Sequence, residues 1–176
     1  MGVTSTEIFG ESGEPAAPGS YGQPPRGFRL PAETRLGPVH LRVSDLKRSI
    51  AYYETMLGLR ALRHDAEGAT LASHDDEREL LVLHEHPGAR PSTRRGRLGL
   101  FHFAILLPDR PSLGRFVKHL ADIGATAGAS DHLVSEAFYL QDPDDLANEV
   151  YADRPRTSWR RAGRQLVMGT DPIDTG

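Results

Sequence analysis

Hydrophobic and polar residues alternate in short runs along the chain, and the same order of runs occurs twice. Residues 39–43 (VHLRV) alternate as a half-buried strand does. A helix is predicted to start at Ser44 or Asp45, since apolar residues then recur at helical spacing until Gly58, a typical C-terminal stop. Three short strand-like runs follow, at 59–65, 69–74 and 78–85.

The second half repeats this order. Residues 101–107 (FHFAILL) predict a strand, and an apolar helical stripe follows that stops at Gly124. Strand-like runs then occupy 129–134, 136–141 and 148–153. The repeat predicts an α+β fold in which two βαβββ modules form one curved mixed sheet, shaped as a cup, with the helices on its convex side.

The domain boundaries follow from composition. Residues 1–28 are rich in glycine, proline and serine without apolar periodicity, which predicts a flexible N-terminal tail. The folded domain is expected over 29–155, with module one at about 36–87 and module two at about 98–155. Residues 156–176 form a C-terminal extension.

Charge and cysteine content exclude several classes of function. The 176-residue chain has a formal net charge of −3 and shows no basic stripe, so nucleic acid and anionic membrane are not expected as partners. It contains no cysteine, which excludes thiolate metal sites and thiol catalysis. No apolar run reaches membrane-spanning length and no signal peptide is evident, so we expect a cytoplasmic protein.

Strand alternation identifies three candidate metal ligands. Val39, Leu41 and Val43 would cover the helix of module one, with Phe101, Phe103, Ile105 and Val150 in the same role in module two. His40, His102 and Glu149 then point to the opposite face, the two histidines at matching positions of the repeat. Two imidazoles and one carboxylate form the facial triad that suits Fe(II) with open coordination sites.

Three segments carry a resemblance to a known family: GPVHLRVSDLKRSIAYYETMLGL, GLFHFAILLPDR and DHLVSEAFYLQDPDDLANEVYADRP. They resemble the vicinal oxygen chelate superfamily, and within it the catechol 2,3-dioxygenase branch, over about residues 28–159. The resemblance implies paired βαβββ modules forming a cup around a divalent metal. It also implies that His40, His102 and Glu149 are the ligands.

Further roles follow from the same resemblance. Tyr139 would hydrogen-bond the substrate oxygen, and His132 would act as an acid–base group near the metal. The alternatives are a tyrosine that bridges core and solvent and a surface histidine at a strand start. The branch usually carries one more histidine on the last strands of module one, where Glu79 is the expected match. Alternation would send the nearby His84 to the helix side, and the Pro-Gly turn would put His86 at the rim.

A fourth ligand position separates dioxygenases from isomerases of this fold. LVLHEHP (81–87) and EVYADRP (149–155) each have a proline six residues after their first position, which registers Leu81 with Glu149. Leucine cannot bind a metal. The expected site is therefore open to a bidentate catechol and O2, which favours an extradiol dioxygenase with Fe(II), or with Mn(II) as the other candidate.

The last expectations concern the substrate class and the alternative functions. A small aromatic diol and O2 are the expected partners. L-DOPA is one candidate, because short extradiol enzymes with a single pair of modules include those that resemble L-DOPA dioxygenases. Arg42, Arg154 and Arg156 could bind its carboxylate. We also expect a homodimer. A metal-dependent isomerase or lyase and a metal-free drug-binding protein of the same fold remain alternatives.

The acidic run Asp142, Asp144 and Asp145 is interpreted as a turn between two strands. A calcium-binding EF-hand loop is disfavoured, because Leu146 occupies the fifth loop position and Ala147 stands where the loop needs glycine.

Overall fold

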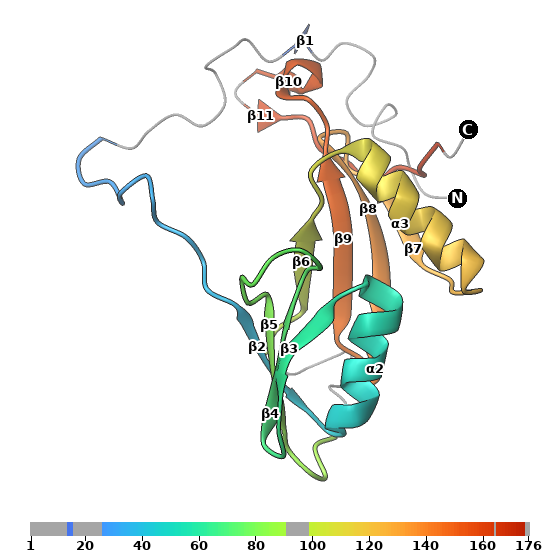
Figure 1. Cartoon of the computed structure of the whole chain (residues 1–176). Helices are drawn as coiled ribbons and strands as arrows, with labels where there is room; N and C mark the ends of the chain where they lie inside the picture. The colour runs from blue at the N-terminus through green and yellow to red at the C-terminus, as the bar shows by residue number, and fades with distance from the viewer. Residues whose placement is uncertain (1–13, 16–25, 91–98, 164, 175–176) are drawn as a thin grey trace.

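A computed structural model describes residues 14–15, 26–90, 99–163 and 165–174 (Figure 1). Two βαβββ units follow one another, which confirms the predicted α+β class and element order. The first unit contains β2 (Val39–Val43), α2 (Leu46–Leu57), β3 (Arg60–His64), β4 (Gly68–Ala72) and β5 (Leu81–Glu85). The second contains β6 (His102–Leu106), α3 (Arg110–Asp122), β7 (Gly128–Asp131), β8 (Ser135–Gln141) and β9 (Ala147–Asp153).

The strands form two four-stranded sheets rather than the single sheet that the repeat predicted. Their orders are β2-β5-β4-β3 and β6-β9-β8-β7, and in each sheet the first and last strands of the module pair in parallel. Among the described residues, β2 and β6 pair only with the last strand of their own module. The two modules are therefore joined by side-chain packing, and both helices lie on the same side of the sheets (Figure 1).

The helix boundaries follow the local signals. Asp45 is the N-cap of α2, and its side chain accepts a hydrogen bond from the Arg48 amide at 2.9 Å. Gly58 ends the helix with φ of 65°, a left-handed conformation that glycine adopts without steric penalty. Asp109 caps α3 in the same way, by accepting from the Ser112 amide. Both helices bury the predicted apolar stripe.

The hydrophobic core crosses the boundary between the modules. Phe103 of β6 belongs to the cluster under α2, while Met56 and Leu57 of α2 pack against the cluster under α3. Tyr53 is fully buried at this junction, and its hydroxyl donates a 2.7 Å hydrogen bond to the buried Asp142 of the β8–β9 turn. Burial, followed by the charge of Asp142, raises the pKa of the Tyr53 phenol.

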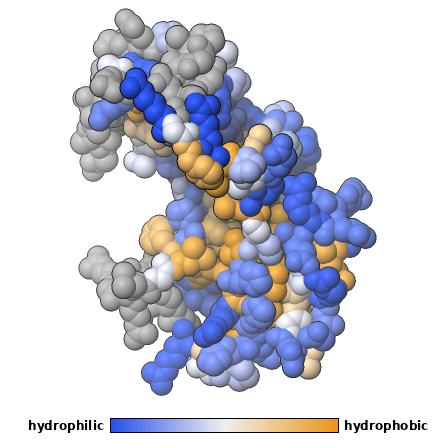
Figure 2. All heavy atoms as spheres, turned by 90° about the vertical axis from the view of Figure 1, so that its left-hand side faces the viewer, coloured by the Kyte–Doolittle hydropathy of each residue, from blue (hydrophilic) through white to orange (hydrophobic). Residues whose placement is uncertain are grey.

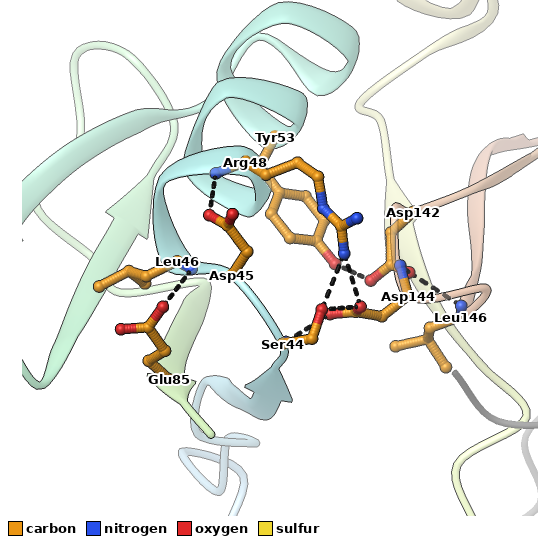
Figure 3. A network of polar contacts seen from close by, with 9 residues as sticks. All are labelled: Ser44, Asp45, Leu46, Arg48, Tyr53, Glu85, Asp142, Asp144 and Leu146. Atoms are coloured by element: carbon orange, nitrogen blue, oxygen red, sulfur yellow. Dashed lines mark hydrogen bonds and ion pairs between the residues drawn. The ribbon is translucent and has the colours of Figure 1, made fainter. Parts of the chain in front are cut away.

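A second polar contact joins the same two elements (Figure 3). The Asp144 carboxylate accepts from the Ser44 amide at 2.8 Å, the Ser44 hydroxyl at 2.5 Å and the Arg48 guanidinium at 2.9 Å. We call Ser44, Arg48 and Asp144 the inter-module clamp. The acidic run thus forms the predicted turn, and it also fixes the start of α2 against module two.

The structure corrects one predicted face in module two. Phe101 was expected to cover α3, but its side chain is 82% exposed. It precedes β6, so strand alternation does not hold it, and its ring instead packs edge-on against the imidazole of His102 at 5.3 Å. Phe103 is buried, but Phe103 and Ile105, which were also expected to cover α3, pack in the cluster under α2 of module one instead.

The chain ends add a small third sheet of β1 (Glu14–Pro15), β10 (Arg160–Ala162) and β11 (Gln165–Leu166), with the 3-10 helix η1 (Arg156–Ser158) before β10. Most of the predicted flexible tail, 1–13 and 16–25, lies outside the described residues. No helix in the described part of the chain is long and apolar enough to span a membrane.

Candidate metal and catalytic site

His102 and Glu149 come together on the face of the module-two sheet that is turned away from α3. We call this face of each sheet the open face. Glu149 pairs with Ala104 in the parallel β6–β9 ladder, two residues beyond His102. The His102 Nε2 and Glu149 Oε2 atoms are 3.1 Å apart, and the carboxylate is the more buried of the two groups.

Tyr139 and His132 extend this pair into a chain of polar contacts. Tyr139 lies directly opposite Glu149 in the antiparallel β8–β9 ladder, and its hydroxyl donates to Glu149 Oε1 at 3.1 Å. On its other side the same hydroxyl is 2.7 Å from His132 Nε2. Both predicted catalytic residues are thus linked to the predicted carboxylate ligand.

The environment of Tyr139 keeps its phenol protonated. Burial, followed by the nearby charge of Glu149 and the hydrogen bond to it, raises the pKa of Tyr139 to about 12. Near neutral pH Tyr139 is therefore a hydrogen-bond donor and not a base. The pKa of Tyr151, on the next open-face position of β9, is also raised, first by burial and then by Asp153 and Glu149.

Module one holds a second pair in the equivalent place. The His40 Nδ1 and His84 Nε2 atoms are 3.1 Å apart, and the two rings stack with their centroids 5.4 Å apart. His84 was predicted to face the helix, and this prediction is wrong. Leu81 and Leu83 fill the core, so alternation along β5 turns His84 to the open face beside His40.

The strand register also corrects the fourth position. His84 pairs with Arg42, two residues beyond His40, as Glu149 pairs with the residue two beyond His102. The structural counterpart of Glu149 is therefore His84 and not Leu81, which is buried. Glu79, the position expected to match an additional histidine, instead forms an ion pair with Arg63.

These side chains fit a divalent metal in their chemistry and in their spacing within each pair. Imidazole and carboxylate are ligands for iron, manganese and zinc, and ligand atoms about 3 Å apart suit metal bonds of about 2.1 Å. His102 Nδ1 is buried and has no hydrogen-bond partner. In the described part of the chain, however, no three His, Asp or Glu side chains form one metal-binding cluster. Each module supplies a pair, and the pairs do not meet around one point.

The three candidate substrate arginines have different surroundings. Arg154 bonds Asp131 at 2.6 Å and the buried Glu136 at 2.8 Å. Arg156 lies over the ring of Trp159, 5.1 Å from its centroid. Arg42 is exposed and pairs with His84 in the β2–β5 ladder. Of the three, Arg42 has the position next to the histidine pair.

Space for a small molecule lies beside His84. A cavity of about 230 Å³ is bounded by residues of β3, β4 and β5, including Arg63, Thr70, Val82 and His84. Hydrophobic surface also gathers in the middle of the face that is turned away from the helices (Figure 2). The cavity itself is lined largely by polar and charged residues, including Asp65 and Glu67.

Comparison with known proteins agrees with this fold. Residues 35–150 match the Glyoxalase/Bleomycin resistance protein/Dioxygenase superfamily. The chain is 42% identical over 143 residues to a catechol-2,3-dioxygenase of Bacillus subtilis, a match that covers 81% of this chain and 50% of that protein. The chain thus spans half the length of this relative.

Solved structures show the same fold. A glyoxalase/dioxygenase from Nostoc punctiforme has a TM-score of 0.59 at 19% identity, covering 75% of this chain and all of that one. A glyoxylase/bleomycin resistance protein/dioxygenase domain from Frankia sp. has a TM-score of 0.57 at 23% identity, covering 70% and 100%. The chain belongs to the Glyoxalase/Bleomycin resistance protein/Dioxygenase superfamily.

Proposed function

We propose that the protein is an extradiol ring-cleaving dioxygenase that acts on a catechol with O2 and a divalent metal, Fe(II) or in its place Mn(II). The observation that carries this proposal is the position of Glu149, within 3.1 Å of both His102 and the Tyr139 hydroxyl. Glu149, a proposed metal ligand, thus lies next to Tyr139 and His132, the two residues proposed to transfer the substrate proton. The similarity to a catechol-2,3-dioxygenase supports the same activity.

His102 and Glu149, which are 3.1 Å apart, would hold the metal, and His40 of module one is the proposed third ligand although its pair lies apart from theirs in this structure. When bound, the metal would lower the pKa of the catechol hydroxyls and bring the diol and O2 into one coordination sphere. The hydrogen bond from the Tyr139 hydroxyl would hold the Glu149 carboxylate in place.

Tyr139 and His132 would move the substrate proton together. A phenol with a pKa of about 12 cannot take a proton by itself at neutral pH. It can accept one at its oxygen while passing its own proton to His132 Nε2, which is 2.7 Å away. Imidazole titrates near neutral pH and is the natural acceptor at the end of such a relay.

His84 would be a second acid–base group on the opposite side of the site. Its contact with His40 and its exposure on the open face support this role. The adjacent cavity would take the ring substituent of the diol, and Arg42 would bind a carboxylate on that substituent, such as the one of L-DOPA. A homodimer remains our proposal, supported by the two edge strands β2 and β6.

The test is anaerobic loading of the full chain with Fe(II), removal of free metal, and addition of air with a panel of catechols. Formation of a yellow ring-opened product from at least one diol, together with O2 uptake in equal amount, is the expected result. Bound metal without ring cleavage would reject the dioxygenase, and absence of metal uptake would favour a metal-free binding protein.

The His84 position also supports a second candidate, a metal-dependent isomerase or lyase of the same fold. Leu81 at the fourth ligand position would have disfavoured this candidate, but the β2–β5 register puts His84 there instead. Three histidines and one glutamate would leave fewer open sites on the metal than the triad does. Loss of metal on substitution of His84 would favour this candidate.

A further inference from the structure

The segment after β11 returns to the edge of the module-two sheet. Asp171 and Asp131 form an antiparallel bridge with two main-chain hydrogen bonds, from the Asp131 amide at 2.7 Å and from the Asp171 amide at 2.9 Å. Val167 is buried, and Ile173 packs against the cluster under α3. We call residues 167–173 the C-terminal strap, and it extends the sheet beyond β7.

The strap reaches the turn that carries His132. His132 lies between β7 and β8, and its Nδ1 atom is 2.7 Å from the main-chain carbonyl oxygen of Gly169. The next residue, Leu133, has φ of 68°, and its amide donates to the Asp131 carboxylate at 2.7 Å. Arg154 holds that carboxylate from the other side. The turn is therefore tightly constrained around the histidine.

The Gly169 carbonyl determines where the His132 protons lie. A carbonyl oxygen only accepts hydrogen bonds, so His132 Nδ1 must carry a proton in this contact. The neutral ring then presents an unprotonated Nε2 to the Tyr139 hydroxyl. That hydroxyl has one proton for two acceptors, His132 Nε2 at 2.7 Å and Glu149 Oε1 at 3.1 Å.

In the neutral state the Tyr139 hydroxyl can donate to only one of these two acceptors at a time. If His132 is doubly protonated, its Nε2 donates to the Tyr139 oxygen, and the Tyr139 hydroxyl donates to Glu149. Nδ1 keeps its bond to Gly169 in both states. The Gly169 contact therefore fixes the orientation of the ring and leaves Nε2 facing the Tyr139 hydroxyl.

We propose that the C-terminal strap is a positioning element of the active site, and that the Gly169 carbonyl fixes His132 with Nδ1 protonated so that Nε2 faces the Tyr139 hydroxyl. This inference rests on the proposed function for its catalytic meaning, whereas the protonation of Nδ1 does not depend on activity. Gly169, 37 positions after His132 in the chain, thereby fixes the His132 imidazole.

The test is nitrogen NMR of the metal-free full chain labelled with 15N-histidine, because protonated and unprotonated ring nitrogens resonate far apart. The chain has eight histidines, so His132→Gln identifies the resonances of interest. At about two pH units above the ordinary imidazole pKa of about 6.5, we expect His132 Nδ1 to be protonated. A His132 protonated at Nε2 alone would overturn the proposal, whatever the variants do.

Two substitutions at Asp171 then test the strap. Asp171→Pro removes the amide that donates to Asp131, whereas Asp171→Ala removes the same side chain and keeps the amide. In the proline variant we expect the Nε2-protonated form of His132 to appear and kcat to fall about 10-fold or more with little change in KM. In the alanine variant we expect Nδ1 to stay protonated.

The possible results distinguish a failure of this proposal from a failure of the proposed dioxygenase function. Rapid hydrogen exchange of the Asp131 amide in Asp171→Pro would show that the bridge is lost. If the His132 resonances are nevertheless unchanged, the proposed positioning role of the strap is overturned. An Nδ1-protonated His132 in a protein that cleaves no catechol would count against the dioxygenase alone. If the proline variant does not fold, the wild-type spectrum still decides the protonation of Nδ1.

Discussion

His84 has the same place in module one that Glu149 has in module two. Each lies on the last strand of its module, and each pairs with the residue two positions beyond the first-strand histidine. Each also contacts that histidine at 3.1 Å. The two groups differ in chemistry, so the repeat provides one imidazole–carboxylate pair and one imidazole–imidazole pair.

Substitutions at these two residues should therefore have different effects. We expect Glu149→Gln to lower metal affinity by more than about 10²-fold, because even groups that only support a ligand contribute 10- to 100-fold. We expect His84→Gln to keep the metal and to lower kcat by about 10²- to 10⁴-fold, as for an acid–base group. Metal content by mass spectrometry and steady-state kinetics measure the two effects. Equal loss of metal in both variants would contradict this assignment.

Tyr139→Phe should lower kcat on the order of 10²-fold while metal content stays unchanged, since it removes the hydroxyl between Glu149 and His132 and leaves the ligand in place. The measurement is kcat at saturating catechol in metal-loaded protein. Tyr151→Phe, on the same open face of β9, is the control and should have the smaller effect.

The raised pKa of Tyr139 also predicts a change in stability at high pH. The folded protein holds the phenol proton to a pKa of about 12, against 10.0 when unperturbed. Its contribution to the free energy of unfolding is therefore fully present below pH 10.0 and is lost as the pH rises through about 12. Denaturant unfolding across this range should show a smaller loss of stability in Tyr139→Phe than in wild type. Parallel curves for the two proteins would contradict the shift.

Asp144→Ala should destabilise the fold by about 1–3 kcal/mol, because it leaves the Ser44 amide and hydroxyl without their partner in a half-buried place. Asp122→Ala is the matched control, since it breaks an exposed ion pair to Lys118 on α3 that contributes less than about 1 kcal/mol. Urea unfolding measures both. Equal losses would show that the inter-module clamp contributes no more than a surface ion pair.

Substitutions at Arg154 and Arg42 should separate an effect on stability from an effect on substrate binding. Arg154→Ala leaves Asp131 and the buried Glu136 short of a partner, and we expect a loss of about 1–3 kcal/mol in the free energy of unfolding. Arg42→Ala should leave stability unchanged and raise KM about 10-fold for a catechol that bears a carboxylate, with no change for plain catechol. A rise in KM for both substrates would contradict a carboxylate site at Arg42.

The sequence by itself determined the element order, the helix ends and the open-face position of the first-strand histidines. These depend on local signals: alternation along 39–43, the Asp45 cap, and the left-handed Gly58. The same alternation gave the relation between Tyr139 and Glu149, since both lie at matching positions of one hairpin. Local chemistry is sufficient where neighbours in sequence are neighbours in space.

Only the tertiary structure decided the register of β5, the contacts of His132 and the joining of the modules. Counting back from a proline registered Leu81 with Glu149. However, His40 pairs with Val82, five residues before Pro87, whereas His102 pairs with Ala147, eight residues before Pro155. The His132–Gly169 contact spans 37 positions and the Ser44–Asp144 contact spans 100. Such contacts depend on how strands and modules pack, and a single sequence carries no local signal for them.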